Sequence, residues 1–258
     1  MIAQQRRREI RRRLATTGFV GTRDLASDLR VNVSTIRRDL DGLARAGLVL
    51  RTHGGAVLAP NPAIDKLVDL PYAIKENERV AEKQAIGAFA AGLVSDGDSL
   101  VLDSGSTTFA VAQALAGRRG LTVATNDLRI AHHLAAEGGV RLVVTGGQLL
   151  ERVFTLVGPV TVDNLVGLHV DWAFLGADAV DLDAGVTNRN TMEVPIKQAM
   201  LGSAARAVLV ADSSKFGRRA MAPVCGVDTF SHVVTDGWLD RADARLYGHR
   251  LVQVPVDG

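Results

Sequence analysis

The chain has 258 residues, 47% of them hydrophobic, which suffices for one large or two modest domains with buried cores. The apolar runs are too short for a membrane span, and the arginines that open the chain argue against a signal peptide. The single cysteine, Cys225, excludes an internal disulfide and a cysteine-based metal cluster. We therefore expect a protein of the reducing cytoplasm that has no metal or other cofactor, with Cys225 as a small buried residue.

The net charge of +2 is divided unevenly along the chain. Residues 1–58 contain twelve arginines, no lysine and five acidic residues, a net charge of +7, and the remainder carries −5. A basic segment joined to an acidic remainder predicts a nucleic-acid partner for the basic segment alone. The alternative interpretation of this charge is a solvated surface without a partner.

The basic segment predicts three short helices followed by a hairpin. Gly18 and Gly47 are suited to ending the first and third helices, and Thr22 and Ser34 to capping the second and third. Two short apolar runs with a glycine turn between them favour a β-hairpin. The expected elements are helices over 2–17, 23–29 and 35–46, and strands over 48–52 and 56–58.

The order of these elements predicts a winged helix-turn-helix in which the third helix reads duplex DNA. Ile36, Leu40 and Leu43 form one buried stripe, which leaves the polar side chains facing outward. A recognition helix presents its N-terminal residues to the major groove, where arginine reads guanine or grips phosphate. The hairpin is the expected wing, and its histidine either contacts phosphate or is a turn residue without a partner. The candidate DNA-binding residues are Ser34, Thr35, Arg37, Arg38, Arg51 and His53.

Two motifs in this segment resemble the signature of the DeoR family of transcription regulators. The sequence TIRRDL at 35–40 is followed at the family's spacing by HGGA at 53–56. The resemblance covers nearly the whole chain. It implies a C-terminal domain that is similar to ribose-5-phosphate isomerases and CoA transferases and that senses a phosphorylated sugar or a related metabolite.

The remainder of the chain predicts an α/β domain. Short apolar strands alternate with helices, which favours a mostly parallel sheet that is covered on both faces. Strands are expected over 100–103, 121–125, 141–145, 171–175, 207–211, 232–235 and 251–254, and helices over 80–93, 108–115 and 128–137. Three prolines follow the hairpin, so the expected domains are a winged helix-turn-helix over 1–58, a linker over 59–71 and the α/β domain over 72–258.

The loops that follow these strands supply the candidate effector residues, because ligands of such sheets bind beyond the carboxyl ends of the strands. A Gly-Ser-Thr loop after Asp103 opens a helix and exposes backbone N–H groups that suit a phosphate. Other loops carry side chains that suit sugar hydroxyls, and Lys215 suits a negative charge. The candidates are Asp103, Gly105, Ser106, Thr107, Thr108, Asn126, Gly146, Gly147, Asp178, Glu193, Asp212 and Lys215.

Each of these loops has a purely structural alternative. The Gly-Ser-Thr loop is otherwise a strand-to-helix turn, Asn126 a helix cap, and the glycine pair at 146–147 a simple turn. Glu193 and Lys197, four residues apart on an expected helix, are able to pair with each other. Asp212 and Lys215 are able to form a surface ion pair.

Three functions compete at this point. The first is a non-enzymatic repressor of carbohydrate metabolism, a homodimer or homotetramer that a phosphorylated sugar releases from its duplex operator. The second is a sugar-phosphate isomerase fused to a DNA-binding domain, which needs a base and a carbonyl-polarising group from among the acidic residues and Lys215. The third is a DNA-binding protein whose C-terminal domain only dimerises. The basic segment and the resemblance favour the first.

Overall fold

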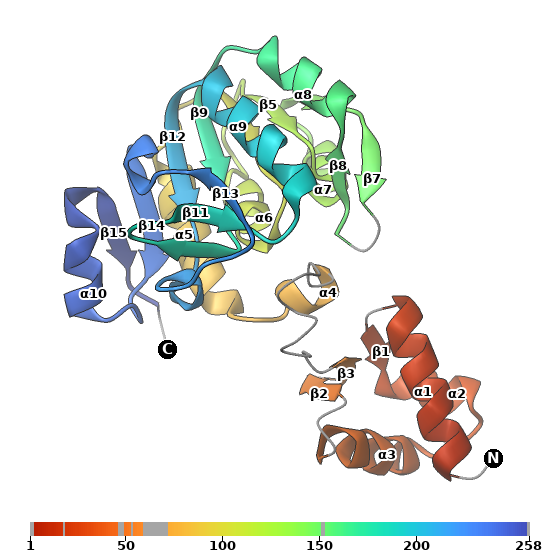
Figure 1. The fold of residues 1–258 in the computed structure, drawn as a ribbon. Coiled ribbons are helices and arrows are strands. Elements are labelled where there is room, and N and C mark those ends of the chain that lie inside the picture. Colours follow the sequence, from red (N-terminus) through yellow and green to blue (C-terminus); the bar gives the residue numbers. More distant parts are fainter. Residues whose placement is uncertain are drawn as a thin grey trace. The chain divides into compact units, whose positions relative to one another are not determined.

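The computed structural model describes residues 3–17, 19–45, 49–52, 54–58, 72–150 and 153–256, so His53 and the expected linker over 59–71 lie outside the described residues. The chain divides into two compact units between Glu78 and Arg79. We call the N-terminal unit the head and the C-terminal unit the body (Figure 1).

The head packs helices against a small antiparallel sheet around one apolar core. Ile10 and Leu14 of the first helix meet Ile36 and Leu40 of the third, and all four side chains are fully buried. The elements are α1 (Ala3–Thr17), β1 (Phe19–Gly21), α2 (Thr22–Asp28), α3 (Val33–Arg45), β2 (Val49–Thr52), β3 (Gly55–Leu58) and the short α4 (Tyr72–Lys75), with strand order β1-β3-β2. The helix-turn-helix and the hairpin are therefore confirmed.

Three local predictions for the head are corrected. Strand β1 was not expected, and it adds a third strand to the hairpin by pairing with β3. Thr22 begins α2 and does not cap it, since Gly21 occupies the cap position. Ser34 lies within α3, and Asn32 is the cap because its Oδ1 accepts a hydrogen bond from the Ser34 backbone N–H at 3.1 Å.

The body is built on a seven-stranded sheet in which every neighbouring pair of strands is parallel. Its order is β15-β14-β12-β9-β4-β5-β6. The strands are β4 (Ser99–Leu102), β5 (Thr122–Thr125), β6 (Arg141–Val144), β9 (Val170–Leu175), β12 (Ala204–Val210), β14 (His232–Asp236) and β15 (Leu251–Val254). The expected parallel α/β sheet is thus confirmed.

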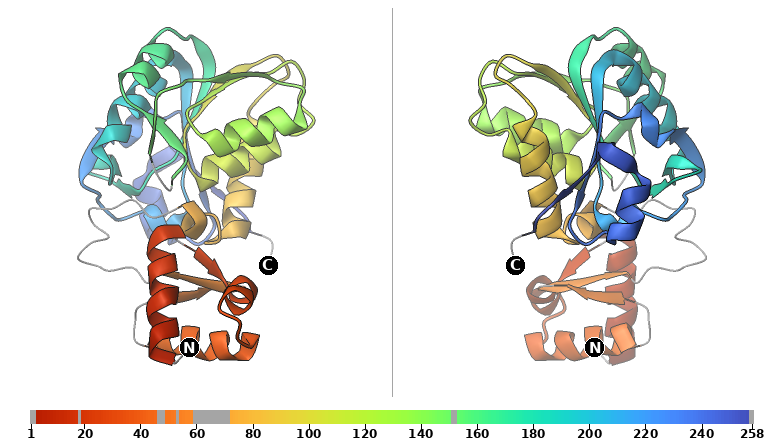
Figure 2. Two further views of the ribbon diagram at one scale, coloured as in Figure 1. Left: turned by 90° about the vertical axis from the view of Figure 1, so that its right-hand side faces the viewer. Right: turned by 90° about the vertical axis from the view of Figure 1, so that its left-hand side faces the viewer.

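Helices cover both faces of this sheet (Figure 2). Alternate strand residues point to opposite faces, so Leu100 and Leu102 pack with one layer and Val101 with the other. The first layer is α5 (Val80–Gly92), α6 (Ser106–Ala114) and α7 (Leu128–Glu137); the second includes α8 (Pro159–Val166), α9 (Val194–Ser203) and α10 (Arg241–Leu246).

Several short elements of the body were not predicted from the sequence. They are the helices α8 and α10, the strands β7 (Gln148–Leu150), β8 (Thr155–Val157), β10 (Ala179–Asp181), β11 (Gly185–Asn188) and β13 (Ala222–Cys225), and the 3-10 turns η1 (Thr191–Glu193), η2 (Ser213–Lys215), η3 (Val227–Thr229) and η4 (Gly248–Arg250). Strands β10, β11 and β13 form a separate three-stranded sheet.

Cys225 was expected to be buried, but its side chain is only partly buried. This partial burial raises the pKa of its thiol to about 11.

The strand order reverses direction between β4 and β9. From β4 the chain proceeds to β5 and β6 on one side, and from β9 to β12, β14 and β15 on the other. In open parallel sheets such a reversal leaves a crevice beyond the carboxyl ends of the two central strands, where ligands bind. Among the described helices, none has the length and apolar character needed to cross a membrane.

Candidate functional site

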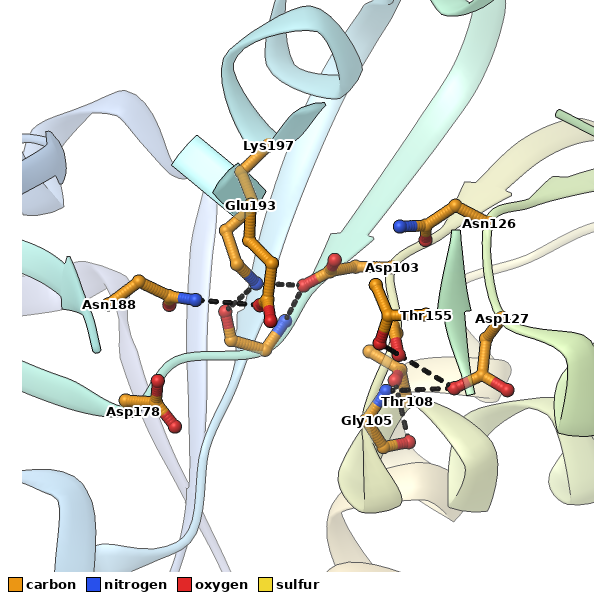
Figure 3. A network of polar contacts seen from close by, with 12 residues as sticks. Asp103, Gly105, Thr108, Asn126, Asp127, Thr155, Asp178, Asn188, Glu193 and Lys197 are labelled. Atoms are coloured by element: carbon orange, nitrogen blue, oxygen red, sulfur yellow. Dashed lines mark hydrogen bonds and ion pairs between the residues drawn. The ribbon is translucent and has the colours of Figure 1, made fainter. Parts of the chain in front are cut away.

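A buried ion pair lies at the reversal point between β4 and β9 (Figure 3). Asp103 directly follows β4, and Lys197 projects from α9; each side chain is only 3% exposed. The Lys197 ammonium donates to the Asp103 carboxylate and, at 2.9 Å, to the Gly176 carbonyl. The Gly176 N–H donates to Asp103 Oδ2 at 2.9 Å. These added hydrogen bonds offset part of the cost of burying the two charges.

Two further carboxylates lie near this pair. Glu193, at the end of η1, is buried and accepts a hydrogen bond from Asn188 Nδ2 at 2.8 Å. Asp178 Oδ2 accepts from the Arg189 backbone N–H at 2.9 Å. Figure 3 shows both carboxylates on the same side of the Asp103–Lys197 pair. We call Asp103, Asp178, Glu193 and Lys197 the acidic cluster.

The electrostatics of the acidic cluster keep Lys197 charged. Burial by itself lowers the pKa of this ammonium, but Asp103, Glu193 and Asp178 outweigh it and raise the pKa of Lys197 above its ordinary value. Pairing of Lys197 with Glu193 along the helix was the structural alternative, yet the ion pair of Lys197 is with Asp103, 94 residues away. With three carboxylates and one ammonium, the acidic cluster carries net negative charge. It therefore favours ligand groups that donate hydrogen bonds over ligand groups that are anionic.

The Gly-Ser-Thr loop begins α6 next to this cluster. Gly105 has φ 148°, a backbone conformation that side chains disfavour, and no side chain caps the helix. The regular hydrogen bonding of this helix begins with the Phe109 N–H, which donates to the Gly105 carbonyl at 2.9 Å. The preceding amides, of Ser106, Thr107 and Thr108, are therefore the orphan donors of a helix N-terminus, which attracts anions. We call these three amides the cradle.

Asp127, which sequence reasoning missed, holds this loop in place. Its fully buried carboxylate accepts from Ser104 Oγ at 2.9 Å and from the Gly105 N–H at 3.2 Å. The same carboxylate caps α7 by accepting from the amides of Arg129 at 2.7 Å and Ile130 at 3.1 Å. Burial raises the pKa of Asp127 in spite of these hydrogen bonds. Its position just before an amphipathic helix was the signal available in the sequence.

Asn126 lies beside the acidic cluster, and the helix-capping role that was its structural alternative belongs to Asp127. Asn126 is 1% exposed, and its Nδ2 donates to the Leu156 carbonyl at 3.1 Å. In Figure 3 its amide end is directed toward Asp103. The structure thus brings together most of the predicted effector residues: Asp103, Gly105, Ser106, Thr107, Thr108, Asn126, Asp178 and Glu193.

Gly146 and Gly147 serve a turn beyond β6, two strands away from β4. Gly147 has φ 122°, and a Cβ there would overlap Thr161 Oγ1 of α8. Thr161 Oγ1 donates to the Gly146 carbonyl at 2.7 Å. These contacts fit the structural alternative, in which the glycines allow close packing of the turn on α8.

Asp212 and Lys215 do not form the surface ion pair that was their structural alternative. Asp212 follows β12 and is 2% exposed; its carboxylate accepts from the Ser214 amide at 3.1 Å and lies 3.6 Å from Arg79 Nε. Lys215, at the end of η2, is half-buried. Asp236, which ends β14, anchors the same loop by accepting from the Ser213 N–H at 2.7 Å.

In the head, a buried ion pair joins α3 to α1. Asp39 is buried and accepts from Arg6 Nε at 2.7 Å and from Arg7 Nε at 3.1 Å, so it joins α3 to α1. Gly42 leaves room for this contact, since a Cβ there would lie 2.8 Å from Arg7 Nη2. Asp39 is thus a structural member of the TIRRDL motif.

The candidate DNA-reading residues of α3 face solvent. Ser34, Arg37 and Arg38 are exposed, and Thr35 is half-buried. Arg51 of the wing is engaged within the head: its Nε lies 3.2 Å from Asp41 Oδ1, and its Nη1 donates to the Gly55 carbonyl at 3.2 Å. A surface pocket of about 650 Å³ between α3 and the wing is lined by Arg23, Arg37 and Arg51, among others.

Two family models match the chain, one on each unit. The model described as DeoR-like helix-turn-helix domain matches residues 6–61, and the DeoR C terminal sensor domain matches residues 78–237.

Among the described residues, no group of three or more His, Cys, Asp or Glu side chains is placed to hold a metal ion.

Curated relatives match over most of their length. The glycerol-3-phosphate regulon repressor of Escherichia coli K12 is 33% identical over 219 residues, which are 85% of this chain and 85% of that protein. The transcriptional repressor AccR of Agrobacterium fabrum is 33% identical over 90% of this chain and 89% of its own. The regulator GlpR of Haloferax volcanii is 34% identical over 100% and 99%.

Solved structures resemble the chain more distantly. Ribose 5-phosphate isomerase A of Methanocaldococcus jannaschii gives a TM-score of 0.39 at 20% identity, over 52% of this chain and 53% of its own. The translation initiation factor eIF-2B of Pyrococcus horikoshii gives a TM-score of 0.44 at 15% identity, over 78% and 68%.

Proposed function

The chain belongs to the DeoR family of transcription regulators, and from that premise we propose that a phosphorylated sugar or related metabolite releases it from its operator. It is a DNA-binding repressor of the kind its relatives are named for, and not an enzyme. One observation carries the ligand assignment: the cradle and the acidic cluster lie together at the strand-order reversal of the sheet.

The cradle supports the phosphate end of this ligand. Its three amides open a nine-residue helix, and the partial positive charge of that terminus favours an anion. The Asp127 carboxylate, at the start of α7, accepts a hydrogen bond from the Gly105 amide and so fixes the geometry of the loop. A phosphate at the cradle needs no lysine or arginine of its own.

The acidic cluster supports the hydroxyl end. Carboxylates accept hydrogen bonds from hydroxyl groups, whereas a second anionic group on the ligand would be repelled by Asp103, Asp178 and Glu193. A molecule with one phosphate and two or more hydroxyls satisfies both halves of the site. Glycerol 3-phosphate meets this description and appears in the name of one relative, which makes it the first probe to use.

The head supports duplex DNA as the partner. Arg37 and Arg38 are exposed on α3, and the wing lies beside them across the pocket that Arg37 and Arg51 line. Helix-turn-helix regulators bind as dimers to paired half-sites, so we propose a homodimer or homotetramer acting on DNA in the cytoplasm. The remaining predictions for DNA contact, His53 and Arg51 included, stay proposals.

The isomerase alternative is disfavoured by the same geometry. An isomerase needs a base free to remove a proton and a donor free to polarise the carbonyl. Asp103 and Lys197, the most buried residues of the acidic cluster, are instead bonded to each other and to Gly176. The relatives named as repressors agree with a binding site in place of a catalytic one.

The test is a competition between ligand and operator on the full chain. A duplex selected by the protein from a random pool is titrated by fluorescence anisotropy with and without glycerol 3-phosphate, a pentose 5-phosphate or a hexose 6-phosphate. At least one of the three is expected to weaken DNA binding by about tenfold or more. Unchanged DNA affinity with all three contradicts the proposal.

A further inference from the structure

The helix α5 occupies a special place in the body, because the chain passes from the head directly into it. The two units divide between Glu78 and Arg79, and α5 begins at Val80. This covalent connection is a route by which a ligand in the body is able to influence the head. Two features link α5 to the cradle and to the ligand-binding edge of the sheet.

The first link is a clamp at Arg79. This residue has φ 52°, in the left-handed region that residues other than glycine rarely adopt, so its placement is enforced by its surroundings. Its Nη1 donates to Ser213 Oγ at 3.2 Å, and its Nε lies 3.6 Å from Asp212 Oδ1. Asp212 follows β12, next to β9 at the same edge as the acidic cluster. The entry point of the body is thus fastened to the ligand-binding edge.

The second link is a contact between helix backbones. Gly87 of α5 packs so closely on α6 that a Cβ there would lie 2.6 Å from the carbonyl carbon and oxygen of Ala110 and 2.9 Å from the Val111 nitrogen. Ala110 is about one turn from the cradle, since a helical turn takes about 3.6 residues. Without a side chain between them, the two helices have no flexible group that absorbs a shift of α6.

We propose that α5 relays occupancy of the cradle to the head, through its backbone contact with α6 and the Arg79 clamp on Asp212. The relay rests on the proposed function, because it presumes that a ligand binds at the cradle. A ligand that binds one arrangement of α6 better shifts the population toward it, and Gly87 obliges α5 to follow. The Arg79 clamp couples the same helix to the neighbouring loop at 212–215.

The main test uses the variant Arg79→Asn in the full chain. Asparagine tolerates the left-handed conformation but is too short to reach Asp212 or Ser213. The measured quantity is the ratio of DNA dissociation constants with and without saturating sugar phosphate, for the three compounds and the selected duplex named above. In the wild-type protein this ratio is expected to reach about ten, and in Arg79→Asn to fall below about three.

Two controls separate the relay from general damage. Arg219→Ala removes another arginine that pairs with carboxylates, Asp181 at 2.8 Å and Asp183 at 3.0 Å, and is expected to keep the wild-type ratio. Affinity of Arg79→Asn for the sugar phosphate, measured without DNA, is expected to stay within about threefold of wild type. That combination distinguishes lost communication from lost binding.

A second pair of variants tests the helix contact. Gly87→Ala is expected to lower the ratio at least threefold, whereas Gly92→Ala, on the same helix with open space around its Cβ position, is expected to leave it unchanged. If Gly87→Ala does not fold, Arg79→Asn decides alone. If none of the three compounds changes the DNA dissociation constant of the wild-type protein, both the proposed function and the relay are overturned. If the wild-type protein responds and Arg79→Asn gives the same ratio of dissociation constants, only the relay is overturned.

Discussion

The head and the body use buried ion pairs for different purposes. In the head, Asp39 of α3 pairs with Arg6 and Arg7 of α1, while Arg37 and Arg38, the proposed DNA contacts, lie exposed. In the body, the buried pair of Asp103 and Lys197 lies at the edge of the sheet where we propose that the ligand binds. Under the proposed function, the head separates the residues that hold the fold from those that bind DNA, whereas the body combines folding and ligand binding in the same residues.

The largest effect is expected from removing the charge at the centre of the body. Lys197→Met leaves the Asp103 carboxylate buried and unpaired, which costs about 3–5 kcal/mol of unfolding free energy. Both tryptophans, Trp172 and Trp238, lie in the body, so urea unfolding followed by their fluorescence reports on this unit. Ligand binding is expected to be lost as well.

A matched variant checks the cause. Asp103→Asn combined with Lys197→Met removes both charges and is expected to recover part of the lost stability without restoring ligand binding. A loss below about 1 kcal/mol in Lys197→Met would mean that the pair is not desolvated as the structure shows. The claim that binding and folding share residues in the body would then be wrong.

A smaller effect is expected from the corresponding change in the head. Asp39→Asn removes the buried carboxylate charge that pairs with Arg6, whose side chain is 11% exposed, and destabilises the head by about 2–3 kcal/mol. DNA binding is expected to weaken, and the tryptophan-detected unfolding of the body to stay unchanged. Loss of sugar-phosphate binding in this variant would contradict the separation of tasks between the two units.

The exposed arginines of α3 are expected to affect DNA binding without affecting stability. Arg37→Ala and Arg38→Ala should each weaken operator binding by about 1–3 kcal/mol if the contact is to a base, or lower the salt slope by about one if it is to phosphate. The thermal midpoint should stay unchanged because both side chains are exposed. Arg45→Ala, in the last turn of the same helix, is the control. Wild-type operator affinity in both variants would remove α3 as the reader.

The smallest expected effect concerns acid stability of the head. Hydrogen bonds from Arg12 and Arg13 lower the pKa of Glu9 from 4.5 to about 2. A carboxylate with a lowered pKa stabilises the folded state above pH 4.5, and that contribution disappears as the pH falls toward 2. Glu9→Gln should therefore flatten the pH dependence of head unfolding in this window, followed by circular dichroism. Arg12 is 70% exposed, so solvent screening keeps the effect small.

The sequence predicted the elements whose signals are local. The helix over 128–137 and the strand over 251–254 have the predicted bounds, since one is capped by Asp127 and amphipathic and the other is a bounded apolar run. The parallel sheet followed from the alternation of such elements. The prediction that Ser34 caps α3 was wrong, because Asn32, two residues earlier, is an equally good cap by residue type.

The parts that the sequence did not predict depend on distant residues. Lys197 pairs with Asp103, 94 residues away, and only the strand order brings them together. Strands β10, β11 and β13 are three or four residues long and are defined by pairing with one another, so no periodicity in the sequence reveals them. The Arg79 clamp joins residues 134 positions apart. Loop residues after strands were found because every parallel strand ends at one edge.

The central claim, that one ligand site in the body controls DNA binding by the head, is tested most directly by reciprocity. The full chain is titrated calorimetrically with the most effective sugar phosphate, once free and once saturated with its selected duplex. Thermodynamic linkage requires DNA to weaken the sugar phosphate by the same factor by which the sugar phosphate weakens DNA. Equal factors of about ten are predicted; a sugar-phosphate affinity that is the same with and without DNA would contradict the account.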